Sequence, residues 1–126
     1  MEPLSETETQ IMRSMLKKAY GPRGPFLDQL AVAVVLGREF TGVGVFVDLR
    51  IPDGVAAADQ VNTELSQDYR TRFDTPADLV GFTLFIRKGY LDFLEGYTFG
   101  EVKWPDQPME TWLVREDVMP AKKKAR

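Results

Sequence analysis

The chain has 126 residues, of which 44% are hydrophobic and 28% charged, and its formal net charge is −3. This length predicts a single domain that can bury its own core without disulfides or metals. The chain contains neither cysteine nor histidine, which excludes thiolate chemistry and removes the commonest general base and zinc ligand. Its net acidity argues against a general nucleic-acid-binding surface.

Nothing in the sequence predicts a membrane segment or a cofactor. The longest uninterrupted apolar run, 30–36, is far shorter than the roughly 20 residues of a membrane span. The N-terminus, MEPLSETETQ, is acidic and lacks the basic-then-apolar order of a secretory signal. We therefore expect a cytoplasmic protein with no membrane partner.

The first predicted element is a helix that begins at Ser5. Ser5 can cap the helix, and Glu8, three residues later, completes a capping box. Apolar residues then recur at helical spacing, at Ile11, Met12, Met15, Leu16 and Ala19. This stripe either packs on a sheet or binds a partner. A segment rich in glycine and proline, 21–25, ends the helix, and Pro25 can open a short second helix through Leu30.

The remaining segments predict a sheet. β-Branched residues predict a strand within 32–40, and alternation predicts another over 43–51. The pattern over 55–73 favours a loop followed by a short strand, and 74–78 favours a turn. A last strand is predicted over 110–116. We expect one α+β domain over residues 1–120 and a basic, disordered tail over 121–126.

A β-hairpin over 79–105 is the richest apolar segment. A two-residue turn at Lys88-Gly89 would pair Arg87 with Tyr90, and continuing that register would pair Phe82 with Glu95. One face would then be apolar: Phe82, Leu84, Ile86, Leu91 and Phe93, extended by Tyr97 and Phe99. The other face would carry Thr83, Phe85, Arg87, Tyr90, Asp92 and Leu94.

Glu95 would be the only charge on the apolar face of this hairpin. A buried carboxylate must pair, accept several hydrogen bonds or take up a proton, and a perturbed acid is one mark of a functional site. The structural alternative is that Glu95 lies at the rim of the sheet, or accepts hydrogen bonds from the backbone or from an arginine such as Arg38 or Arg50. Both interpretations stay open at this stage.

Two segments resemble a group of small bacterial proteins. These are Arg38 to Phe46 (REFTGVGVF) and, later, Leu94-Glu95-Gly96-Tyr97 followed by Trp104-Pro105. The resemblance covers about 29–105, with a loose match over 55–78. It implies a bacterial, cytoplasmic α+β protein, of a kind that binds partners in accessory or conflict-related gene neighbourhoods. The group carries no established activity or catalytic residues to transfer to this chain.

We therefore predict an N-terminal helix and a short second helix packed on a mainly antiparallel sheet of about five strands. The leading hypothesis is a non-enzymatic module that binds another protein, with a toxin-neutralising, immunity-like role as one form. An alternative is a domain that binds a small ligand or cation through Glu95, and a weaker one is an enzyme with a carboxylate pair. No catalytic residue, metal site or cofactor is predicted. The candidate binding residues are Arg38, Glu39, Phe85, Tyr90, Glu95, Tyr97 and Trp104.

Overall fold

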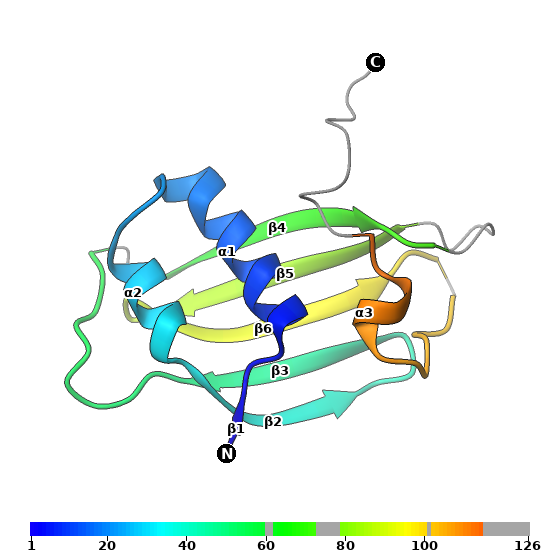
Figure 1. Ribbon diagram of the computed structural model, residues 1–126, viewed down its shortest axis with the longest axis horizontal. Helices are drawn as coiled ribbons and strands as arrows, with labels where there is room; N and C mark the ends of the chain where they lie inside the picture. The colour runs from blue at the N-terminus through cyan, green and yellow to red at the C-terminus, as the bar shows by residue number, and fades with distance from the viewer. Residues whose placement is uncertain (60–61, 73–78, 101, 115–126) are drawn as a thin grey trace.

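Six antiparallel strands form one sheet in the computed structural model, which describes residues 1–59, 62–72, 79–100 and 102–114. The spatial order of the strands is β1-β2-β3-β6-β5-β4. Figure 1 shows that the helices lie on one side of this sheet. The strands are β1 (Glu2–Pro3), β2 (Val34–Phe40), β3 (Gly44–Arg50), β4 (Asn62–Arg70), β5 (Leu79–Arg87) and β6 (Tyr90–Thr98), and the helices are α1 (Glu6–Tyr20), α2 (Pro25–Val32) and α3 (Met109–Trp112).

The predicted start of α1 is confirmed. The Ser5 side chain accepts a hydrogen bond from the Glu8 backbone N–H, and the Glu8 carboxylate accepts one from the Ser5 backbone N–H. The two groups satisfy helix-terminal donors reciprocally. The apolar stripe of α1 packs on the sheet, where Met12 and Leu16 are fully buried. This agrees with the structural interpretation for Ile11, Met12, Met15 and Leu16, which are buried, whereas Ala19 is exposed.

The α+β class is confirmed, although the sheet has six strands rather than about five. The strand predicted over 110–116 is wrong within the described residues, because Met109–Trp112 forms the short helix α3. Only Leu113 makes an isolated bridge, to Thr71. The strand predicted at the end of 55–73 is nine residues long as β4. The turn predicted over 74–78 and the tail over 121–126 lie outside the described residues.

The hairpin turn is correct, but the register beyond it is not. Lys88 and Gly89 both have positive φ, and Arg87 pairs with Tyr90 as predicted. A β-bulge then inserts Asp92 between two paired residues, so that Phe93 lies opposite Phe85. Because side chains alternate between faces with a period of two, this single extra residue moves every later side chain of β6 to the other face.

The bulge therefore reverses the predicted surroundings of Glu95. Glu95 lies opposite Thr83, and Gly96 takes the place opposite Phe82. Leu94, predicted to face outward, is buried under the helices, whereas Phe93 and Tyr97 point to the other face. Glu95 is therefore not a charge on the buried face.

Two glycines let the central strands approach closely. A Cβ atom on Gly44 would lie 2.2 Å from the backbone oxygen of Gly96. A Cβ atom on Gly96 would lie 2.8 Å from the rings of both Phe82 and Trp104. Side chains at these two positions would therefore keep β3 and β6 from approaching as closely as they do. The backbone N–H of Trp104 also donates to the Gly42 carbonyl at 2.8 Å.

A buried glutamine joins α2 to the hairpin turn. The Gln29 side chain is fully buried, and its amide donates to the carbonyls of Ala56 and Gly89 at 3.1 and 2.9 Å. Its side-chain oxygen accepts a hydrogen bond from the Leu91 backbone N–H at 3.0 Å. One side chain thus satisfies backbone groups from two loops and a strand. The sequence pattern gave no signal for this role.

Candidate functional site

The face of the sheet opposite the helices is covered by no described element, and we call it the open face (Figure 1). Strand register assigns its side chains, since alternate residues of paired strands share a face. The central part of the open face is formed by Glu39, Phe46, Asp48, Glu64, Ser66, Asp68, Thr83, Phe85, Phe93, Glu95 and Tyr97. Five of the predicted binding residues belong to it: Glu39, Phe85, Glu95 and Tyr97, and, at its end opposite Arg87, Tyr90.

Aromatic side chains form the centre of the open face. Phe85 and Phe93 stack with ring centroids 4.3 Å apart, and Phe46 meets Phe93 edge-on at 5.9 Å. The Tyr97 ring lies over Gly81, where an added Cβ would come within 2.5 Å of it. All four rings are only half-buried. Three neighbouring strands thus hold four rings whose outer surfaces face solvent.

Acidic side chains surround these rings. Glu39 and Glu95 lie on either side of Phe46 in one row across the sheet, and Asp48 lies opposite Phe93. On the outer strand, Glu64 lies opposite Phe85 and Asp68 opposite Gly81. The arginines that register places on this face, Arg50, Arg70 and Arg87, are each the last residue of a strand. The middle of the open face is therefore acidic, and its positive charges lie at its ends.

Glu95 stands in the middle of this surface without an ion pair or hydrogen bond to any described residue. It lies beside Phe46 on β3 and Thr83 on β5, and it is half-buried. Arg38 cannot reach it, because Arg38 pairs in the row of Val47 and Leu94, on the helix-covered face. The predicted combination of Glu95 with Arg38 is therefore not formed.

Tyr90 lies at one end of the open face and is held by a loop. The Tyr90 hydroxyl donates a hydrogen bond to the Val55 carbonyl at 3.1 Å. At the same end of the face, the guanidinium of Arg87 lies 5.2 Å from the centroid of the Phe85 ring. The loop over 51–59 also contacts the hairpin turn, since the Ala58 N–H donates to the Gly89 carbonyl. Tyr90 therefore has a structural partner, unlike Glu95.

Arg38 forms an ion-pair cluster on the other side of the sheet. Its guanidinium donates two hydrogen bonds to the two oxygens of Glu8, both at 2.8 Å, and a third to Glu2. Burial acts to raise the pKa of Glu8, but the hydrogen bonds and charge of Arg38, together with hydrogen bonds from Ser5, outweigh it and lower that pKa. The hydrogen bonds from Arg38 to Glu8 also raise the pKa of Arg38. Both groups thus stay charged at neutral pH.

A cavity of about 370 Å³ lies beside this ion pair. Arg38 and Glu8 form its charged side, and Trp104 belongs to its apolar wall. The wall also contains Phe40, Val45, Pro105, Pro108 and Met109. Asp106 and Glu110 add carboxylates to the lining. The structure thus brings two predicted residues, Arg38 and Trp104, together at a second place, on the side of the sheet away from Glu95.

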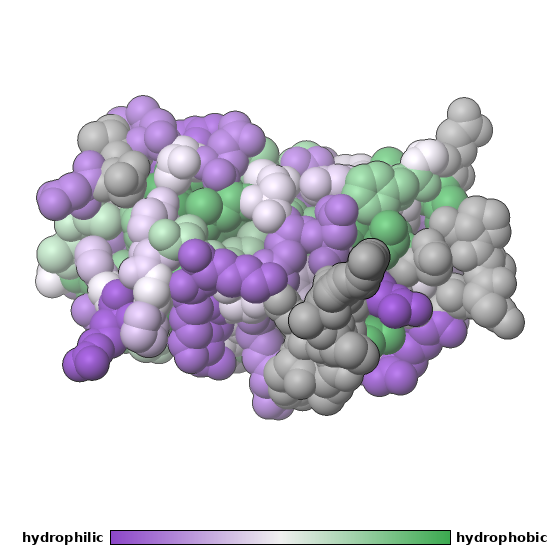
Figure 2. All heavy atoms as spheres, turned by 90° about the horizontal axis from the view of Figure 1, so that it is seen from above, coloured by the Kyte–Doolittle hydropathy of each residue, from purple (hydrophilic) through white to green (hydrophobic). Residues whose placement is uncertain are grey.

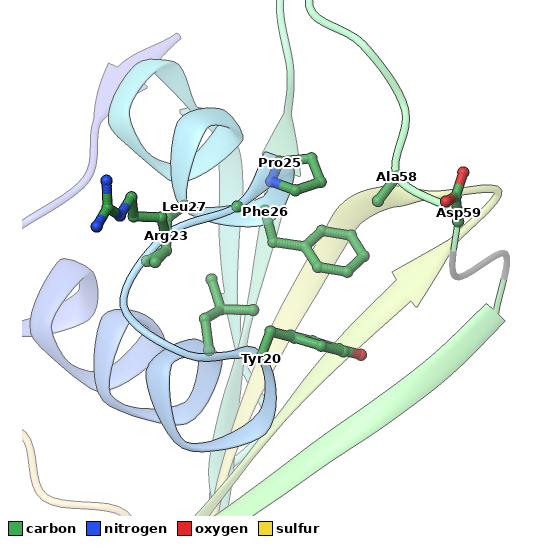
Figure 3. A pocket seen from close by; sticks show the side chains of 9 residues that line it. Tyr20, Arg23, Pro25, Phe26, Leu27, Ala58 and Asp59 are labelled. Carbon is green, nitrogen blue, oxygen red and sulfur yellow. The ribbon is translucent and has the colours of Figure 1, made fainter.

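A smaller cavity of about 190 Å³ lies between the two long helices and the loop over 51–59. Figure 3 shows the rings of Tyr20 and Phe26 pointing the same way, beneath Ala58 and Asp59, whereas Arg23 points away. The ring centroids of Tyr20 and Phe26 are 5.1 Å apart. With no charged group of the helices directed into it, this cavity has the features of imperfect packing at a helix–loop junction.

The described residues contain no group of three or more acidic, histidine or cysteine side chains placed to hold a metal ion. Among the same residues, no helix is long and apolar enough to cross a membrane. The sequence interpretation missed Phe46 and Phe93 as members of the surface. Alternation along β3 places the Phe46 side chain on the face away from the buried valines of the same strand. The face on which the Phe93 side chain lies is decided only by the bulge at Asp92.

Comparisons with known proteins give no further assignment. No family model, no curated protein and no solved structure matches this chain.

Proposed function

We propose that this protein is a non-enzymatic protein-binding module, and that its open face binds a positively charged protein surface. The observation that carries the proposal is the uncovered cluster of four aromatic rings surrounded by five carboxylates. Aromatic side chains are favoured anchors at protein interfaces because they bury large areas at low entropic cost. A rigid sheet presents them already positioned, which reduces the ordering cost of binding.

The charge pattern specifies the partner's chemistry. Glu39, Asp48 and Glu95 flank the rings from both sides, and Glu64 and Asp68 extend the acidic area onto β4. Complementary potentials raise association rates and exclude like-charged partners. A matching surface therefore carries lysines or arginines around an apolar or aromatic side chain. A toxin-neutralising, immunity-like role is one form of this proposal, in which the basic surface belongs to a toxin.

The test is a paired charge reversal. The tagged full-length protein is used to capture partners, and any captured protein is purified and its affinity measured by calorimetry at several salt concentrations. We expect Glu39→Lys/Glu95→Lys to lower the affinity roughly tenfold or more, with a smaller salt dependence than the wild type. Asp28→Lys is the control for each single reversal, Glu39→Lys and Glu95→Lys, because it changes the net charge equally and Asp28 is exposed on α2, in the helix layer.

Truncation of an aromatic ring separates the apolar contribution from the charges. Phe85→Ala should weaken binding while leaving the salt dependence unchanged, since it removes contact area but no charge. A partner that binds the charge-reversed protein as tightly as the wild type would show that the open face is not the binding surface. A partner with an acidic contact surface would contradict the proposed chemistry.

The cavity at Arg38 favours a second candidate, a small-ligand site. Its volume is within the range of ligand pockets, with apolar walls and a few charged groups. Arg38 is already paired with Glu2 and Glu8, and Asp106 lies 3.8 Å from the Lys103 ammonium, so Glu110 contributes the remaining negative charge and a cationic ligand with an apolar body fits best. A thermal-shift screen of aromatic amines should stabilise the wild type and the control Leu36→Lys, but not Phe40→Lys. Equal shifts in all three proteins would contradict this candidate.

A further inference from the structure

The outer edge of β4 lacks the bulges, prolines and lysines that often block strand pairing, although the strand carries Glu64, Asp68 and Arg70. β4 is the last strand of the sheet, and its nine residues pair with β5 without a register shift. It contains no proline, glycine or lysine. No described segment pairs with its outer edge between Asn62 and Asp68. Such an edge is a ready template for another strand.

The opposite edge of the sheet is blocked over the first part of β2. There β1 has only two residues, one of them Pro3, and it covers Val34 and Val35. A bulge at Leu36 follows immediately, between the pairs made by Val35 and Gly37. Proline and bulges are the usual means of stopping further pairing at an edge. Among the described residues, β4 therefore offers the longer edge without a bulge, since only 37–40 of β2 extend beyond the bulge on the other side.

The chain already adds backbone to this edge at one end. The Arg72 N–H donates to the Trp112 carbonyl at 2.8 Å, and the Val114 N–H donates to the Arg70 carbonyl at 2.9 Å. The backbone groups of Arg70 thus point outward, and alternation directs those of Asn62, Glu64, Ser66 and Asp68 outward as well. No described residue bonds the outward backbone N–H and C=O groups of these four residues, which lie along the open part of the edge.

We propose that a second copy of this chain pairs here, with the two β4 strands antiparallel about a two-fold axis at Leu65. In this register Glu64 lies opposite the partner's Ser66, and Asn62 lies opposite the partner's Asp68. All four outward residues are used, and each opposed pair can exchange two backbone hydrogen bonds. The half-buried Leu65 meets its own copy across the axis.

Charge selects this register over its neighbours. Centring the pair on Ser66 would place Glu64 opposite the partner's Asp68, and centring it on Glu64 would place two Glu64 side chains opposite each other. Like charges directly opposite each other destabilise an antiparallel pair. Only the register centred on Leu65 uses the whole open edge without such a contact, and it stops short of Arg70, where Val114 is bonded.

The resulting dimer would have one continuous sheet of twelve strands, with both open faces on the same side. Figure 2 views the molecule from the side on which β4 lies in Figure 1, and shows mostly hydrophilic groups with smaller apolar patches between them. A dimer held by backbone hydrogen bonds and polar pairs over such a surface is weak and concentration-dependent. The inference concerns self-association and does not rest on the proposed partner.

Sedimentation equilibrium of the full-length protein, up to its highest soluble concentration, tests the inference. Ser66→Ala is the reference, since every substitution at Ser66 removes its 2.9 Å contact with the Thr83 hydroxyl. Ser66→Pro removes an outward N–H and no bond to β5, so the dimer should be lost while the fold persists by circular dichroism. Ser66→Lys places a lysine opposite the partner's Glu64 twice per dimer, which should raise the dimerisation affinity about two- to thirtyfold. Ser66→Glu places like charges opposite each other and should lower the dimerisation affinity.

Each outcome decides the inference. A wild-type monomer at every concentration overturns it, and so does a Ser66→Pro protein that dimerises as tightly as Ser66→Ala. Weaker dimerisation of Ser66→Lys overturns the register, because only a pair centred on Ser66 brings the two lysines together. Concentration-dependent protection of the Glu64 and Ser66 amides from hydrogen exchange would support it. The charge-reversed open-face variant should dimerise normally, which keeps this test separate from that of the proposed function.

Discussion

Replacing Glu8 with glutamine should destabilise the protein, because it breaks the ion pair that joins α1 to β2. The side chain of Glu8 is 4% exposed and accepts two hydrogen bonds from Arg38, whose side chain is 25% exposed. Removing one partner of a buried pair costs about 3–5 kcal/mol, since it leaves an uncompensated charge. Arg38 keeps Glu2 and some access to water, so we expect a loss of about 2–4 kcal/mol. For a chain of this length that is a fall in Tm of roughly 6–20 °C.

The same substitution should remove part of the protein's sensitivity to acid. Because the pKa of Glu8 is lowered by folding, its stabilising contribution is fully present above about pH 4.5 and is lost as the pH falls through the folded-state pKa. Glutamine resembles the protonated acid and has no such contribution to lose. The difference in unfolding free energy between the wild type and Glu8→Gln should therefore shrink as the pH decreases from neutral toward 3.

Urea unfolding followed by circular dichroism at several pH values measures both effects. Glu6→Gln is the control, since Glu6 lies exposed in the same helical turn and outside the ion pair. The double variant Glu8→Gln/Arg38→Gln should be more stable than the sum of the two single losses predicts, because it removes both charges. If Glu8→Gln costs no more than Glu6→Gln, or if its effect is independent of pH, the energetic role assigned to this pair is wrong.

Two further substitutions test the packing that positions the hairpin. Gln29→Leu should cost about 1–3 kcal/mol for the orphaned Leu91 N–H alone, measured as a lower urea midpoint, and it should increase hydrogen exchange at the turn. An unchanged midpoint would mean that the Leu91 N–H finds another partner. Gly44→Ala should destabilise by about 1–3 kcal/mol or more, because its Cβ would overlap the Gly96 carbonyl oxygen. Gly37→Ala, in the adjacent strand with open space around it, is the control, and equal effects of the two alanines would refute the close-approach argument.

Local chemistry determined much of this fold from the sequence alone. The capping box at Ser5 and the turn at Lys88-Gly89 depend on residues within four positions of each other, so their structure follows from short-range contacts. The alternation in 43–51 likewise placed β3 correctly, because one of its faces is buried. The α+β class follows from these elements together.

The tertiary structure alone decided the place of Glu95. The hairpin pattern favoured an uninterrupted register, and the single extra residue Asp92 shifted Glu95 from the predicted core to the open face. β3 contributes to that outcome, since it pairs Val47 with Leu94 and so fixes which face of β6 is buried. Contacts between distant strands therefore outweighed the local pattern.

Contacts between residues distant in the sequence also decided the structural roles of Arg38, Trp104 and β4. Arg38 and Glu8 are thirty residues apart, and no spacing in the sequence indicates that they pair. The sequence by itself determined where the first two helices, the hairpin turn and most strands lie, because those depend on neighbours along the chain. Only the tertiary structure decided which face of the sheet stays open and which edge stays unpaired, because both depend on how the whole sheet is ordered.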